Sequence, residues 1–206
     1  MSTVIQEFIE GRGVKSLFHF TRLKNLPSIL QHGLLTKEAC AATGIAPVIN
    51  DPYRFDGTGA ISASISYPNY KMFYRLRCEN PEIEWVVVKL KRSLLWRTEC
   101  AFSSTNAGDS SVYNIPLARR MGLAPLQDMF ADYGHKERAS LKIPDHYTTN
   151  PQAEVLLLEG AAVEDIKGVY FQRSVTHKKF EAEYPALTCI LNGGFFDGRS
   201  DHAHWK

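Results

Sequence analysis

The sequence has 206 residues, 44% of them hydrophobic, and a formal net charge of +2. This size predicts one sizeable core and a single domain over residues 1–206, and the weak charge neither requires nor excludes a nucleic-acid partner. No run approaches the ~18 apolar residues of a membrane span, and the four scattered cysteines indicate reduced, mostly buried thiols. We therefore expect a cytoplasmic protein without a membrane partner.

The first half of the chain predicts strands that alternate with helices. A short helix within residues 1–13 is expected to pack outside the main domain, as an extension ended by glycines. Residues 17–21 alternate as a strand and residues 23–31 have helical spacing. Further elements are expected as strands at 60–66, 84–90 and 101–103, and as a helix at 69–77 opened by Pro68.

His19 lies near the end of the first predicted strand, just before a helix, where open sheets place ligand groups. A histidine between two phenylalanines is often a satisfied core residue. Thr21 favours a ligand-binding interpretation of His19. Residues i and i+2 of a strand share a face, so the two side chains could present two polar groups to one ligand. Asn25 is either a surface residue of the following helix or the third member of this set.

Residues 34–59 are rich in Gly, Pro, Asn and Asp, and predict a long loop. Loops of this length in a compact domain are commonly lids or binding loops. Tyr53, Arg54 and Phe55 at its centre suit stacking on nucleic-acid bases, although a simple surface patch explains them equally well.

The helix at 69–77 carries an aromatic stripe that core packing explains for the most part. Lys71 lies in its first turn, where the helix dipole favours anions. A lysine there destabilises the helix slightly unless a phosphate is bound, so Lys71 is a modest signal of a phosphate site.

The second half predicts helices at 115–121 and 125–133, a charged irregular segment at 134–147, and then residues 149–158, whose second half is a nearly continuous apolar run. This run is typical of a strand buried on both faces. A carboxylate inside it, Glu154, is unfavourable unless it is paired or lines a cavity. Glu154 is therefore either a solvent-facing or salt-bridged residue at a strand end, or a catalytic carboxylate at the floor of a cleft.

The last elements expected are strands at 169–171 and 187–191 and a helix at 176–183 with Thr176 as its N-cap. Three glycines then predict a frayed tail over residues 192–206.

The chain has no Walker loop, no dinucleotide fingerprint and no H-E-x-x-H or G-x-S-x-G motif. It resembles the ADP-ribosyltransferases, and more closely the DarT-type DNA ADP-ribosyltransferase toxins of bacteria. The resemblance rests on blocks in family order: Phe18-His19-Phe20-Thr21, Asn25-Leu26-Pro27-Ser28-Ile29-Leu30, Gly33-Leu34, Asn106-Ala107 and Pro151-Gln152-Ala153-Glu154-Val155-Leu156. Residues 67–74 look more like the guanine-modifying branch than the thymine-modifying one.

The resemblance implies an α+β fold, with a split β-sheet core, flanking helices and long substrate loops. It implies catalytic roles for Glu154 and Lys71. It implies that NAD+, as co-substrate and without a metal, is bound by His19, Phe20, Thr21, Asn25, Lys71 and Tyr74. The residues expected to contact DNA are Tyr53, Arg54, Asn106, His146 and Tyr147.

The function implied is that of a toxin from a toxin–antitoxin pair. It would transfer ADP-ribose from NAD+ to a base of single-stranded DNA, with guanine expected, and a cognate ADP-ribosyl-hydrolase antitoxin would remove the mark. Two other functions stay open: an ADP-ribosyltransferase that acts on RNA or protein, and a non-catalytic nucleic-acid-binding module.

Overall fold

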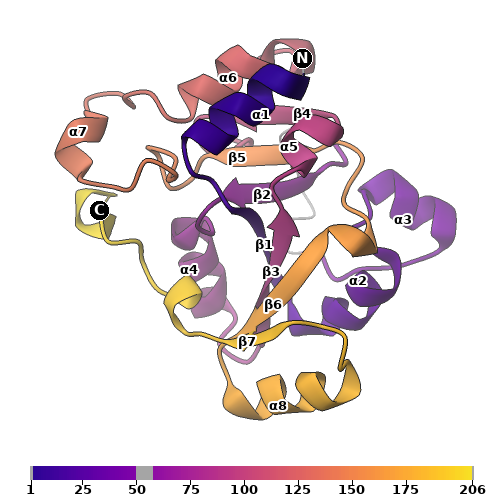
Figure 1. Cartoon of the computed structure of the whole chain (residues 1–206). Helices are drawn as coiled ribbons and strands as arrows, with labels where there is room; N and C mark the ends of the chain where they lie inside the picture. The colour runs from indigo at the N-terminus through magenta and orange to yellow at the C-terminus, as the bar shows by residue number, and fades with distance from the viewer. Residues whose placement is uncertain (1, 50–57, 206) are drawn as a thin grey trace.

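The structure is a computed structural model that describes residues 2–49 and 58–205. Its described residues form a seven-stranded sheet in the order β4-β5-β2-β1-β3-β6-β7, flanked by helices (Figure 1). Neighbouring strands are antiparallel except for β6 and β7. The strands are β1 (Ser16–Arg22), β2 (Ile61–Ile65), β3 (Trp85–Lys91), β4 (Cys100–Ser103), β5 (Glu154–Leu157), β6 (Ile166–Phe171) and β7 (Cys189–Leu191). This confirms the expected α+β class.

The sheet splits between its two central strands. β1 and β2 pair only at Leu17 with Ile65 and at Phe18 with Ser64. Beyond Phe18, β1 continues along β3, while β2 continues along β5. At the position of His19, β1 and β2 are therefore no longer paired.

One face of the sheet is covered by several helices, which bury a large hydrophobic core cluster against it. The helices with residues in this core cluster are α1 (Ser2–Gly11), α2 (Leu26–His32), α5 (Leu94–Arg97), α6 (Leu123–Asp128) and α8 (Ser174–Glu183). The expectation that the N-terminal helix packs outside the domain was wrong. Ile5 and Ile9 lie one helical turn apart on α1, and both are buried in this core.

The opposite face is covered by α4 (Tyr70–Glu79) and by the C-terminal segment. Phe73 of α4 is fully buried and stacks on Phe20 of β1, with ring centroids 4.6 Å apart. Asn69 caps the helix, because its Oδ1 accepts the backbone N–H of Met72 at 3.2 Å. The helix therefore begins two residues after Pro68.

Several connections are more ordered than their composition suggests. The first part of the predicted loop 34–59 holds α3 (Lys37–Thr43), which Thr36 caps by accepting the Ala39 N–H at 3.2 Å. The segment 134–147 holds α7 (Arg138–Leu141). Helix α8 begins at Ser174, so Thr176 is a buried residue inside the helix and not its cap. Short 3-10 helices lie at Leu23–Asn25, Leu117–Arg120, Val163–Asp165, Gly194–Phe196 and His202–Trp205.

All four cysteines are free, but only Cys40 and Cys100 are buried; Cys78 is exposed and Cys189 is half-buried. None of the helices in the described part of the chain is long and apolar enough to cross a membrane.

The C-terminal residues are packed against the domain, which corrects the expectation of a frayed tail. Phe196 and Trp205 are buried, and the last 3-10 helix, His202–Trp205, lies near α7 (Figure 1). An ion pair between Arg199 and Asp201, 2.5 Å apart, is buried beside Trp205, whose indole Nε1 donates to Asp201 at 2.7 Å. The glycines of this segment permit its turns and do not release it.

We expect acid to weaken the packing of this segment. Burial alone would raise the pKa of Asp201, but its hydrogen bond with Arg199, the charge of Arg199 and the indole of Trp205 outweigh burial, so the pKa lies below its ordinary value. A carboxylate with a lowered folded-state pKa stabilises the protein above its unfolded-state pKa and loses this contribution as pH falls through the folded-state pKa.

The free energy of unfolding should therefore fall more steeply below about pH 4 in the wild type than in Asp201→Asn. Urea unfolding of both proteins at pH 6 and pH 3 measures this difference. An equal fall in both proteins would contradict the assignment.

Candidate active site

Glu154 begins β5 and is buried, with 6% of its surface exposed. Its Oε2 accepts the backbone N–H of Ala107 at 3.0 Å, and its Oε1 accepts the side-chain Nδ2 of Asn106 at 3.3 Å. Asn106 is itself held, because its Oδ1 accepts the backbone N–H of Gly108 at 2.9 Å. The carboxylate is therefore fixed in orientation by the loop after β4, and it does not face open solvent.

A buried arginine lies on the same side of the sheet as this carboxylate. Ser103 is the direct cross-strand partner of Glu154, so the two side chains share a face. Arg120 is 3% exposed, and its Nη2 donates to the hydroxyl of Ser103 at 2.6 Å. Neither residue was expected at the site. Nothing in the sequence distinguishes Arg120 from its neighbour Arg119, which is exposed.

His19 lies at the split in the sheet. Its Nδ1 is 2.8 Å from the backbone carbonyl of Ser62, so the imidazole bridges β1 and β2 where the strands part. Ser62 pairs with Leu156 of β5, two residues from Glu154. By register, His19 leaves β1 on the side of Val88, whereas Glu154 lies on the side of Phe18. The two side chains therefore leave opposite faces of the sheet, and a ligand that contacts both must pass where β1 and β2 part.

Thr21 and Asn25 form a polar group with the chain that follows α3. Thr21 is 4% exposed and accepts a hydrogen bond from Asn25 Nδ2 at 3.0 Å. The same amide nitrogen donates to the carbonyl of Val48 at 3.0 Å, and Asn25 Oδ1 accepts the Val48 N–H at 2.9 Å. Asn25 therefore ties the chain after β1 to the predicted binding loop at Val48. Tyr53 and Arg54 of that loop lie outside the described residues.

The first turn of α4 lies beside the Glu154 loop. The Sδ of Met72 is 3.8 Å from Asn106 Nδ2, the same nitrogen that bonds Glu154. Lys71 Nζ donates to the backbone carbonyl of Trp205 at 2.5 Å. The first turn of α4, which carries Lys71, thus lies beside the loop that holds Glu154, and the Lys71 ammonium has a carbonyl partner.

Two of the expected NAD+ contacts lie elsewhere. The ring of Phe20 stacks on Phe73 in the apolar cluster under α4, on the face of β1 opposite His19. Tyr74 is 63% exposed and lines a hollow of about 340 Å³ with Trp85. Trp85 pairs with the last residue of β1, at the end of the strand away from the carboxylate. The structure does not bring Phe20 or Tyr74 together with His19 and Thr21.

The remaining residues expected to contact DNA are packed against one another or against the site. His146 and Tyr147 form an edge-to-face pair with ring centroids 4.8 Å apart. Burial lowers the pKa of His146, and the charge of Arg138 lowers it further, which disfavours the charged imidazole that would attract a phosphate. Asn106, expected to contact DNA, instead holds the Glu154 carboxylate.

Comparisons with known proteins match this chain to one family model and to several solved structures. The family model described as DarT, ssDNA thymidine ADP-ribosyltransferase, matches residues 18–187. No curated protein matches the sequence.

Solved structures share the fold at low identity. Thermosipho africanus DarTG in complex with ADP-ribose has a TM-score of 0.59 and 15% identity over 88% of this chain and 51% of that chain. Thermus sp. 2.9 DarT in complex with NAD+ has a TM-score of 0.56 and 10% identity over 89% of this chain and 98% of that chain. The same Thermus protein in complex with ADP-ribosylated ssDNA has a TM-score of 0.55 and 12% identity over 90% of this chain and 97% of that chain. The present chain thus spans about half the length of the Thermosipho chain.

Proposed function

Because the chain belongs to the DarT family of ssDNA ADP-ribosyltransferases, we propose that it transfers ADP-ribose from NAD+ to a guanine base of single-stranded DNA and releases nicotinamide. The observation that carries this proposal is the buried Glu154 carboxylate, held on both oxygens beside the split that His19 bridges. The Thermus relative was solved with NAD+ and with ADP-ribosylated ssDNA, which supports both substrates for this chain.

The chemistry suits a single fixed carboxylate. As the bond between nicotinamide and the ribose C1′ breaks, nicotinamide leaves and positive charge builds on the ribose, which a preorganised carboxylate stabilises. A guanine nitrogen then forms the new bond to C1′, and its proton passes to Glu154 as general base. Asn106 and the Ala107 N–H keep the carboxylate in place during both events.

The donor is held, in this proposal, by groups on both sides of the split. His19 and Thr21 contact the nicotinamide-ribose half of NAD+, and Asn25 keeps the adjacent chain in position through Val48. Lys71 exchanges the Trp205 carbonyl for an oxygen of the pyrophosphate, at a helix start where the dipole also favours an anion.

The base is the point on which the sequence and the family description differ. Residues 67–74 favour guanine, whereas the family model is described by thymidine. We expect the purified protein with NAD+ to add one ADP-ribose to single-stranded oligonucleotides that contain guanine.

Four oligonucleotides that differ at one central position (G, T, A or C) test this by mass spectrometry. An adduct on thymine alone would overturn the guanine assignment, while the proposal of an ssDNA ADP-ribosyltransferase would still hold. If RNA or protein is modified while DNA of every composition stays unmodified, the DNA assignment fails as a whole.

We further propose that the protein is a toxin whose mark is removed by a cognate ADP-ribosyl hydrolase. The similarity to one part of Thermosipho DarTG supports this pairing, because the present chain spans about half of that protein. Expression of the wild type should stop bacterial growth, and a co-expressed ADP-ribosyl hydrolase that acts on DNA should restore it. Unimpeded growth during expression of active enzyme would contradict the toxin role.

A further inference from the structure

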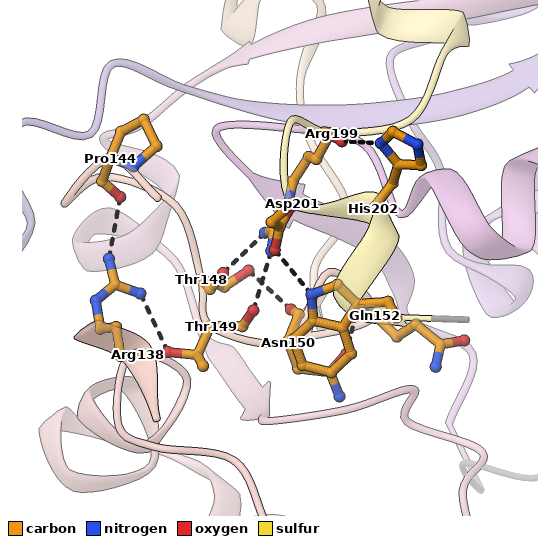
Figure 2. Close-up of polar contacts among 10 residues, drawn as sticks. Arg138, Pro144, Thr148, Thr149, Asn150, Gln152, Arg199, Asp201 and His202 are labelled. Carbon is orange, nitrogen blue, oxygen red and sulfur yellow. Dashed lines mark hydrogen bonds and ion pairs between the residues drawn. The ribbon is translucent and has the colours of Figure 1, made fainter. Parts of the chain in front are cut away.

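The C-terminal segment, residues 194–205, crosses the chain that leads into β5 (Figure 2). Arg199 is 2% exposed, and its guanidinium donates to the carbonyls of Thr148 at 2.8 Å and Thr149 at 3.0 Å. Its Nε and Nη2 also bind the carboxylate of Asp201, at 2.8 and 2.5 Å. Trp205 completes the group through its indole N–H. One buried arginine therefore fixes two successive backbone carbonyls while its charge is balanced.

The chain held by Arg199 runs directly to the carboxylate. The Thr148 hydroxyl donates to the carbonyl of Asn150 at 3.0 Å, and the same carbonyl accepts the N–H of Ala153 at 3.1 Å. The side chain of Asn150 accepts the N–H of Gln152 at 3.0 Å (Figure 2). These bonds form a tight turn that ends one residue before Glu154. A displacement of the Thr148 and Thr149 carbonyls is thus transmitted to the start of β5.

The segment is itself anchored to the other side of the site. The hydroxyl of Tyr67, two residues beyond β2, donates to the carbonyl of Asp197 at 3.2 Å and also to that of Gly194. Arg77 of α4 donates to the carbonyl of Phe196. The anchors at Tyr67 and on α4 give Arg199 a fixed position relative to α4, whose first turn lies against Asn106.

We propose that residues 194–205 are a positioning segment for the transfer reaction, in which Arg199 and Asp201 set the position of Glu154 by holding the turn at 148–150. This inference rests on the proposed function. The segment lies C-terminal to the matched family region, residues 18–187. Arg199 acts through the backbone and does not itself touch the substrates, so its loss should change the rate of chemistry more than the binding of NAD+. Small displacements of a catalytic group are enough, because a shift of about 1 Å can lower a rate by about 10²-fold.

The test measures kcat and the KM for NAD+ for the full-length wild type, Arg199→Lys and Trp205→Phe. The acceptor is the unmodified oligonucleotide to which the wild type adds ADP-ribose. Lysine keeps the charge but cannot bind two carbonyls and a bidentate carboxylate together. We expect Arg199→Lys to lower kcat by about 10- to 100-fold with KM unchanged. Trp205→Phe keeps an aromatic ring but loses the hydrogen bond to Asp201, and should lower kcat less. Arg173→Lys, whose side chain is 69% exposed, is the control and should match the wild type in both constants.

Each other outcome decides against the inference. A folded Arg199→Lys with wild-type kcat overturns it. The inference is also overturned if kcat of Arg199→Lys falls only together with a raised KM and a lowered melting temperature, because this pattern indicates general destabilisation. Should Arg199→Lys fail to fold, an unchanged kcat in Trp205→Phe is the contrary result. A wild type that transfers nothing overturns the proposed function, and with it this inference, whereas an active wild type isolates the role of Arg199.

Discussion

Replacing Glu154 by glutamine should lower ADP-ribose transfer by about 10²- to 10⁴-fold and leave NAD+ affinity almost unchanged. Within the described ranges 2–49 and 58–205, the carboxylate accepts from Asn106 Nδ2 and from the Ala107 N–H. Glutamine has one acceptor oxygen and one NH₂ group, so its NH₂ must face one of these donors. Asn106 cannot simply turn its own amide to compensate, because its Oδ1 already accepts the Gly108 N–H. The variant therefore loses both the negative charge and the orientation of the group.

Glu159→Gln is the matched control, because Glu159 is an exposed carboxylate five residues further along the chain. Transfer is measured by mass spectrometry of the oligonucleotide, and NAD+ binding by calorimetry. We expect Glu159→Gln to match the wild type and Glu154→Gln to lose its toxicity on expression. Transfer by Glu154→Gln above about a tenth of the wild-type rate would show that the reaction does not depend on this carboxylate.

The parts of this site that could be predicted are those with a local signal. Alternation reveals β1 and puts His19 and Thr21 on one face, because a strand repeats every two residues. Glu154 is conspicuous because a charge in an apolar run is unfavourable without a partner. These signals arise within a few residues of the chain, so one sequence is enough to find them.

The parts that could not be predicted depend on contacts between distant segments. The Ala107 N–H binds Glu154 across 47 positions, and a backbone group has no signature in the sequence. Arg199 reaches Thr148 across 51 positions, and the glycines around it favour the interpretation of a loose tail. Phe20 belongs to a family motif, but its ring packs on Phe73, which local spacing does not show. Tertiary packing decides these positions.

Replacing His19 by alanine should raise the dissociation constant for NAD+ by about 10- to 100-fold, the effect of losing one good hydrogen bond at a partly buried site. The tautomer follows from the structure. The Ser62 carbonyl can only accept, so Nδ1 carries the proton and, in the neutral ring, Nε2 is an acceptor. In the proposed complex with NAD+, this nitrogen accepts a hydrogen bond from a ribose hydroxyl of the donor.

Two conservative variants separate the binding role of His19 from its bridging role. Asparagine places a donor where Nδ1 lies and keeps the bond to Ser62, but it has no group at the position of Nε2. Glutamine places a polar group near Nε2 and loses the bridge. We expect His19→Gln to retain more NAD+ affinity than His19→Asn, and His32→Ala, at an exposed position on α2, to bind as the wild type does. The opposite order in calorimetry, with His19→Asn binding as well as wild type, would assign His19 to holding the two strands together and remove it from the NAD+ site.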